Sequence, residues 1–176
     1  MTDDAASPAS PAVETERLIV RDWRDDEADR MFDMYSRLEV VRFLGTVPTP
    51  MTSVEEAQEA IRRARERNAA IAPLGWWAVV VRDTGHVAGT VGLVPLETGE
   101  TEVIWHLHPD SMGNGYATES ARAVLARAHA HGIEEVIALV DVANEPSRNV
   151  ALRLGLEPRG GAQHRGKVLE VFVSRA

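Results

Sequence analysis

The chain has 176 residues, a formal net charge of -8 and no cysteine. This length predicts one domain with a core of its own. The absence of cysteine excludes disulfides, a thiol nucleophile and thiolate-bound metals. The negative charge argues against nucleic acid or an anionic membrane as a partner.

The start of the chain differs in composition from the rest. Residues 1–14 are acidic and rich in Ala, Ser and Pro, so we predict a disordered tail there, followed by a single domain over residues 15–176. The tail lacks the positive charge and apolar run of a signal peptide. No apolar run approaches the roughly 18 residues of a membrane span. These features are compatible with a cytoplasmic location.

The first half of the domain predicts one strand and two helices. Residues 16–23 alternate polar and apolar side chains, as a strand does. Residues 25–38 carry apolar side chains at helical spacing after an acidic first turn. Residues 46–50 contain two prolines and predict a loop. Residues 53–68 predict a helix with a thin apolar face, which Thr52 or Ser53 would cap.

The middle of the chain predicts an antiparallel meander. Three strands are expected, at residues 76–82, 87–96 and 102–108, and short turns join them. Trp76 and Trp77 would point to opposite faces of this sheet. We expect both rings to lie in the core, although one of them could line an acceptor cleft.

The last third alternates helices and strands. A helix should follow Gly115 and stop at Gly132. Residues 135–142 predict a strand, residues 144–155 a short helix, and residues 166–173 a closing strand, with room for one more. The whole order predicts an α/β fold with a central, mostly antiparallel mixed sheet and helices on both faces.

The stretch SMGNGYATES, residues 111–120, places two glycines directly before a helix. A helix N-terminus has unpaired N–H groups, and glycines let an anion approach them, so the stretch suggests a phosphate site. The alternative is a tight turn from strand to helix with no ligand. A P-loop is not present, and the G-x-G-x-x-G pattern of dinucleotide folds fails at Thr118.

Four stretches in this order form a recognisable set: TERLIVRDW, EVIWHLHPD, MGNGYATES and NEPSRNVALRLGLEP. Together they resemble the GNAT superfamily of acetyl-CoA-dependent N-acetyltransferases, and within it the RimJ/RimL branch, whose named members acetylate N-termini of ribosomal proteins. The resemblance runs from Thr15 to Val173. It implies the GNAT fold and direct attack of a primary amine on acetyl-CoA, with a protein N-terminal amine as the favoured acceptor.

The resemblance also implies which residues hold acetyl-CoA. The main chain of Trp105, His106 and Leu107 would bind the pantetheine arm, and one of its N–H groups would polarise the thioester carbonyl. Asn144 would contact the pantetheine as well. Met112 stands where the family has Gln or Arg, which puts the usual side-chain contact in doubt. The pyrophosphate would lie on the loop formed by Met112, Gly113, Asn114, Gly115, Tyr116 and Ala117.

Two residues are the candidate catalytic groups. Ser147, in the N-x-x-S motif that starts at Asn144, would give a proton to the leaving thiolate. The alternative is that both are only helix-capping and first-turn residues. Glu102 is the candidate base for the acceptor amine, its alternative being a surface carboxylate. Glu170 is a second candidate base, and Arg148 or Arg153 a candidate for the 3′-phosphate.

Other functions remain open at this point. His106 and His108 share one side of a strand, but a metal site needs a third ligand and none is evident, so we expect no metal. A small-molecule or antibiotic acetyltransferase would use the same chemistry on another amine. A non-catalytic acyl-CoA-binding module, or a domain without a cofactor, is the third possibility. We expect a monomer or homodimer.

Overall fold

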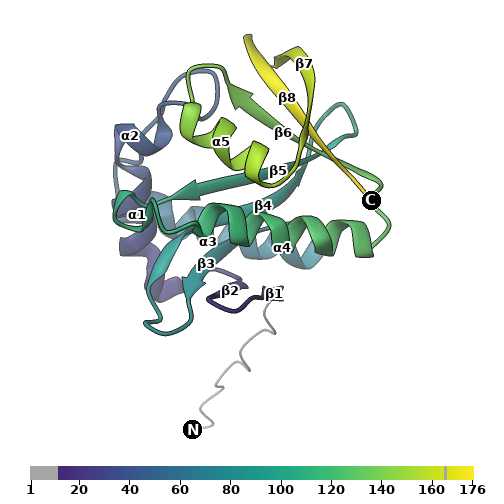
Figure 1. Cartoon of the computed structure of the whole chain (residues 1–176). Coiled ribbons are helices and arrows are strands. Elements are labelled where there is room, and N and C mark those ends of the chain that lie inside the picture. The colour runs from purple at the N-terminus through teal and green to yellow at the C-terminus, as the bar shows by residue number, and fades with distance from the viewer. Residues whose placement is uncertain (1–11, 165) are drawn as a thin grey trace, which may run out of the picture.

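The computed structural model describes residues 12–164 and 166–176 (Figure 1). Its strands are β1 (Val13–Glu14), β2 (Leu18–Arg21), β3 (Gly75–Val81), β4 (Val87–Pro95), β5 (Thr101–Leu107), β6 (Glu135–Asp141), β7 (Glu157–His164) and β8 (Lys167–Arg175). Its helices are α1 (Ala28–Tyr35), α2 (Leu38–Val41), α3 (Val54–Ala70), α4 (Tyr116–Ala130) and α5 (Glu145–Arg153), with short 3-10 turns η1 (Asp25–Glu27) and η2 (Pro109–Ser111).

The strands form one mixed sheet in the order β1-β2-β3-β4-β5-β6-β8-β7. Every neighbouring pair is antiparallel except β5 and β6, which run parallel. The predicted meander is therefore confirmed as β3, β4 and β5. The predicted mixed α/β fold with a mostly antiparallel sheet is confirmed too.

Helices cover both faces of the sheet, as predicted, and each face has its own core (Figure 1). On one face α4 and α5 pack through small and branched residues such as Ala121, Val124 and Ala151. On the other face α1, α2 and α3 pack against the alternate residues of β3. Trp77 joins the first core and Trp76 packs against the second, which confirms their opposite orientation.

Local signals set the helix ends where the sequence indicated. The Ser53 hydroxyl accepts the main-chain N–H of Glu56 at 3.4 Å, and α3 begins there. Thr52 donates its hydroxyl to the Glu56 carboxylate at 2.6 Å, so both capping candidates take part. Gly132 follows α4 with a φ of +84°, a left-handed conformation that suits glycine.

The structure differs from the sequence-based expectation at two places. Val13 and Glu14, which we assigned to the tail, pair with β2, while residues 1–11 of the tail lie outside the described residues. The four-residue helix α2 follows α1 directly. The additional final strand, for which the expectation left room, is the edge strand β7 at Glu157–His164. No helix within residues 12–164 and 166–176 is long and apolar enough to cross a membrane.

The parallel pair is short, and this opens the sheet. β5 and β6 pair only at Thr101 with Val136 and at Glu102 with Ile137. Beyond these two pairs, β5 continues to Leu107 and β6 continues to Asp141 along diverging paths, with α5 in front of the opening in Figure 1. The far edge of β5 therefore has no strand partner among the described residues, and a cleft forms there.

Candidate active site

A cleft of about 1500 Å³ occupies the opening between β5 and β6. Residues of β5, the glycine loop, the start of α4, β6 and α5 line it, together with residues of the α2 region and of the β7–β8 hairpin. Eleven of the twelve predicted site residues line it: Glu102, Trp105, His106, Leu107, Met112, Gly113, Asn114, Gly115, Ala117, Asn144 and Ser147. Residues from three distant parts of the chain thus meet in one space.

The glycine loop takes a conformation that glycine favours. Gly113 and Gly115 both have a φ of +80°, and Gly115 is the N-cap of α4. A side chain would be strained at either position. The Asn114 amide donates to the main-chain oxygens of Ser111 and Met112, 3.2 Å from each. A Cβ on Gly113 would meet no other atom within 4 Å, so the main chain there is open to a ligand.

Tyr116 is the predicted loop residue that does not line the cleft. Its ring lies partly buried against the core formed with α4, and the guanidinium of Arg17 sits 5.2 Å above the ring centre. The main chain of Tyr116 belongs to the glycine loop and the start of α4, as predicted, but its side chain does not line the cleft. Its side chain instead anchors the first turn of α4.

The open edge of β5 supplies polar main-chain groups. Gly89, Thr90 and Val91 of β4 pair with Leu107, His106 and Trp105 respectively, on the closed side of β5. The other edge of these residues has no strand partner in the described part of the chain. Main-chain N–H and C=O groups without a strand partner can form hydrogen bonds with a ligand. An extended ligand that contains amide groups fits such an edge.

The start of α5 brings Asn144 and Ser147 to the opposite wall. The Asn144 side chain accepts the main-chain N–H of Ser147 at 3.3 Å and caps the helix. Both residues still line the cleft. Capping and ligand contact are thus compatible at Asn144, as the sequence suggested.

The remaining acid and base candidates fall into two groups. Glu102 and Arg153 line the cleft. Glu170 and Arg148 do not line it, and Arg148 Nε donates to the Glu170 carboxylate at 2.5 Å. Each neutralises the other outside the cleft. We therefore withdraw Glu170 as a base and Arg148 as a phosphate contact.

His106 has a side-chain environment that sequence reasoning missed. Its Nδ1 lies 3.0 Å from the Tyr35 hydroxyl, which also donates to Thr90 at 3.1 Å. Burial lowers the pKa of His106 to about 4, so the imidazole is neutral at pH 7. Burial also raises the pKa of Tyr35. No local pattern predicts this contact, because 71 residues separate the two partners.

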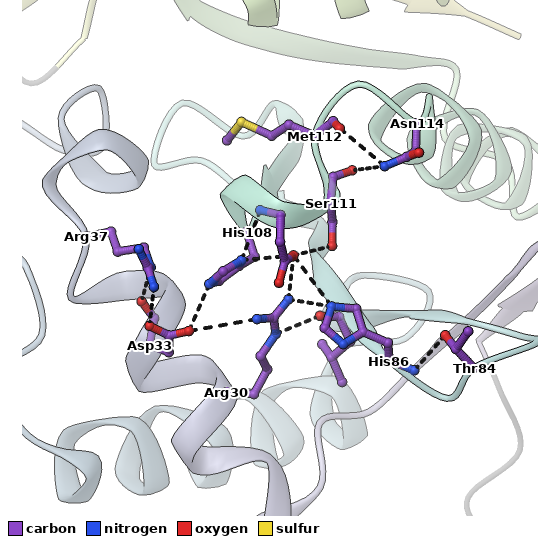
Figure 2. A network of polar contacts seen from close by, with 11 residues as sticks. Arg30, Asp33, Arg37, Thr84, His86, His108, Ser111, Met112 and Asn114 are labelled. Atoms are coloured by element: carbon purple, nitrogen blue, oxygen red, sulfur yellow. Dashed lines mark hydrogen bonds and ion pairs between the residues drawn. The ribbon is translucent and has the colours of Figure 1, made fainter.

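His108 is the buried member of a network of polar side chains, and its charged partners are partly exposed (Figure 2). Its Nε2 lies 2.9 Å from Asp33 of α1, and its Nδ1 lies 2.9 Å from Asp110. Arg30 donates to Asp110 at 2.8 Å. These contacts tie α1 to the segment that enters the glycine loop. Among the described residues no group of three or more His, Cys, Asp or Glu side chains could hold a metal ion.

Cations from other elements also line the cleft. Arg17 of the N-terminal segment lies beside the loop, and Arg122 of α4 lies near α5, where it donates to the main-chain oxygen of Arg153 at 2.9 Å. Arg42, His164 and Lys167 line the cleft as well, together with the apolar residues Val40, Phe43 and Leu44. The cleft is therefore suited to a long anionic ligand that reaches a second substrate.

The open strand edge, the bare glycine loop before α4 and the cations suit an acetyl-CoA-dependent acetyltransferase. The family model described as an acetyltransferase (GNAT) domain matches residues 17–157, and the chain belongs to this family. A relative, the uncharacterized N-acetyltransferase YoaA of Bacillus subtilis (strain 168), is 29% identical over 153 residues, covering 85% of each chain.

Two solved structures share the fold to the same degree. One is RimL, a ribosomal L7/L12 α-N-protein acetyltransferase in complex with coenzyme A, with a TM-score of 0.77, 16% identity, and coverage of 92% of this chain and 95% of that one. The other is the microcin C7 self-immunity acetyltransferase MccE in complex with acetyl-CoA and AMP. It has a TM-score of 0.77, 13% identity, and coverage of 92% and 94%. The fold fits acetyl-CoA-dependent acetyl transfer and leaves the acceptor open.

Proposed function

We propose that this enzyme transfers the acetyl group of acetyl-CoA to a primary amine, with a protein N-terminal amine as the favoured acceptor. The observation that carries this proposal is the convergence of Glu102, the open edge of β5, the glycine loop and Ser147 on one cleft. Acetyl-CoA supplies an activated thioester when bound. The residues of the chain bind it, orient it and move protons.

The cofactor is expected to lie along the open edge of the sheet. In this proposal the main-chain N–H groups from Gly113 to Ala117 hold the pyrophosphate, supported by the partial positive charge at the start of α4. The main chain of Trp105, His106 and Leu107 and the side chain of Asn144 hold the pantetheine arm. Arg153, with Arg122 beside it, is proposed to bind the 3′-phosphate, because both residues line the cleft.

Two side chains are assigned to proton transfer. Ser147, on the first turn of α5, is proposed to donate a proton to the departing thiolate. Glu102, on the opposite wall, is proposed to accept the proton of the acceptor amine. An α-amino group has a pKa near 8, so about a tenth of it is neutral at pH 7, and we expect a carboxylate to be a sufficient base. A lysine amine, with a pKa of about 10.4, would need a stronger base.

Apolar residues of two elements line the cleft beside its polar groups. They are Val40, Phe43 and Leu44 in and after α2, and Leu169 of β8. We propose that the acceptor peptide extends along these side chains. A small polyamine, amino sugar or antibiotic remains the alternative acceptor, and the likeness to MccE keeps it in view.

The test is a coupled release assay. Purified protein and acetyl-CoA are mixed with three panels of acceptors. The first contains lysine-free peptides with a free N-terminus. The second contains peptides with an acetylated N-terminus and one lysine, and the third contains small amines. Free coenzyme A is measured with a thiol-reactive dye, and products by mass spectrometry. We expect turnover with the first panel above the other two. Turnover confined to small amines would assign the alternative, and tight binding without product would assign a non-catalytic acyl-CoA-binding module.

A further inference from the structure

Arg17 is fixed beside the glycine loop although it lies about a hundred residues earlier in the chain. Its Nη1 donates to the main-chain oxygen of Asn114 at 3.1 Å, and its Nε donates to Glu119 at 2.7 Å. Its guanidinium also covers the ring of Tyr116. All three partners belong to the glycine loop or to the start of α4, so these contacts hold the Arg17 side chain against the loop.

Glu119 holds the guanidinium in this place. One carboxylate oxygen accepts the hydroxyl of Thr15 at 2.6 Å and the main-chain N–H of Arg17 at 3.2 Å. The other accepts the Arg17 side chain. A guanidinium held in advance loses less conformational entropy when it binds a ligand.

The Arg17 side chain still has donors to offer. A guanidinium carries five N–H groups. The Nε group, one on Nη1 and one on Nη2 are used by Glu119 and Asn114. One N–H on each terminal nitrogen has no partner among residues 12–164 and 166–176. Half of the side chain is exposed, at 50%, and it lines the cleft.

Those two N–H groups lie close to Gly115, where the main chain of the loop is proposed to bind the pyrophosphate. A Cβ built on Gly115 would come within 3.5 Å of Nη2 of Arg17, and no other atom outside the neighbouring residues lies within 4 Å of it. Gly115 thus leaves a space that the guanidinium borders. Met112, the residue before Gly113 in the loop, is apolar and 50% exposed. It has no donor for a phosphate.

We propose that Arg17 is the side-chain contact to the cofactor pyrophosphate, in place of the loop residue Met112. This inference rests on the proposed binding of acetyl-CoA in the cleft. Two free N–H groups of a guanidinium match two oxygens of a phosphate. Because Glu119 offsets the charge of Arg17, the contact adds to the main-chain N–H groups of the loop and does not replace them. Arg153 and Arg122, near α5, are left for the 3′-phosphate.

Binding calorimetry with two ligands tests this assignment. Coenzyme A and 3′-dephospho-coenzyme A both carry the pyrophosphate, and only the first carries the 3′-phosphate. For Arg17→Met we expect the affinity for both ligands to fall by the same factor, roughly tenfold, the usual size of a lost charge-assisted hydrogen bond. The matched control is Arg153→Met, which should weaken coenzyme A and leave the dephosphorylated ligand unaffected.

A compensating substitution separates ligand contact from folding. Met112 is exposed, so an arginine is tolerated there, and Met112→Arg in the Arg17→Met background should recover most of the lost affinity. Met112→Leu in the same background should recover none. If Arg17→Met does not fold, Arg17→Lys is used instead, because lysine keeps a positive charge near Glu119 but lacks the planar guanidinium. Its affinity for coenzyme A and for the dephosphorylated ligand should fall by the same factor, which should be smaller than tenfold.

Three outcomes overturn the assignment. The first is an unchanged affinity in folded Arg17→Met. The second is a loss of affinity for coenzyme A with no loss of affinity for 3′-dephospho-coenzyme A, which would assign Arg17 to the 3′-phosphate instead. The third is the absence of any recovery with Met112→Arg. If instead the wild-type protein binds neither ligand, the proposed cofactor site itself fails, so the two failures are distinguishable.

Discussion

The hydroxyl of Tyr35 lies 3.0 Å from Nδ1 of His106 and joins the last turn of α1 to the strand that borders the cleft. Because burial lowers the pKa of His106 to about 4, the folded protein keeps this ring neutral. An unfolded histidine titrates near 6.5. Between pH 6.5 and 4 the unfolded state therefore binds more protons than the native state, and the free energy of unfolding falls as the pH falls.

We predict that His106→Gln makes the protein less sensitive to acid. Glutamine keeps a polar group for Tyr35 but does not titrate. Relative to pH 7, wild type should lose at most about 3 kcal/mol more stability than the variant by pH 4, since each pKa unit corresponds to 1.36 kcal/mol. The measurement is urea unfolding at several pH values. Parallel pH profiles for the two proteins would show that His106 does not titrate this way.

Asp110→Asn should loosen the network of Figure 2. Hydrogen bonds from Arg30 above all, and also from Ser111 and His108, hold the pKa of Asp110 well below its usual range. The side chain is 46% exposed, so we expect a loss of only about 1 kcal/mol in unfolding free energy at pH 7. Asp110 leads into the glycine loop, and the affinity for acetyl-CoA should fall as well.

The pH dependence of this loss has a definite sign. A lowered carboxyl pKa stabilises the fold above the unfolded value, near 3.9, and the contribution disappears as the pH falls through the folded value. The difference in stability between wild type and Asp110→Asn should therefore begin to shrink below about pH 4 and should disappear only when the pH falls below the lowered pKa of the folded state. Asp83→Asn, in the exposed turn between β3 and β4, is the matched control and should change neither property. A constant difference at all pH values would contradict the electrostatic explanation.

The sequence predicted those parts of the fold that depend on local pattern. Alternating apolar residues and short turns predict the meander of β3, β4 and β5, and the glycine pair predicts the start of α4. β7 was not assigned with certainty, because Glu157–His164 is mostly exposed and includes a proline and two glycines. An exposed edge strand does not need the alternation that burial imposes.

The parts of the site that were missed all come from contacts between distant segments. Arg17 and Glu119 are 102 residues apart, and nothing near either one indicates the other. The same holds for the contact of Tyr35 with His106. Conversely, Glu170 and Arg148 were candidates as isolated residues, and the fold pairs them with each other. Residue type suggests chemistry, but the partner decides whether a group is available.

Ser147→Ala should separate chemistry from binding. The hydroxyl is proposed to protonate the leaving thiolate, and a general acid typically contributes on the order of 100-fold or more. We expect kcat to fall by about that factor with KM for acetyl-CoA changed by less than about threefold. Steady-state thiol release measures both constants. A kcat within a factor of two of wild type would remove Ser147 from the proton path.

Asn144 offers a test that distinguishes capping from cofactor contact. Asn144→Ala should cost about 1 kcal/mol of stability, since the side chain caps α5, and should weaken acetyl-CoA binding. Asn144→Asp should keep the cap, because aspartate caps equally well, but should still weaken binding through its charge. Thermal unfolding and calorimetry give the two readouts. Full affinity in the aspartate variant would leave Asn144 with a structural role alone.

The most direct test of the central claim is the heat of binding of acetyl-CoA to wild type, Gly115→Glu and Gly99→Glu. Both glycines have positive φ, +80° and +88°, so both substitutions strain the main chain alike. Only Gly115 lines the cleft. We predict micromolar binding to wild type and to Gly99→Glu, and no binding to folded Gly115→Glu. No binding to wild type, or equal binding to all three, would contradict a cofactor site on the glycine loop.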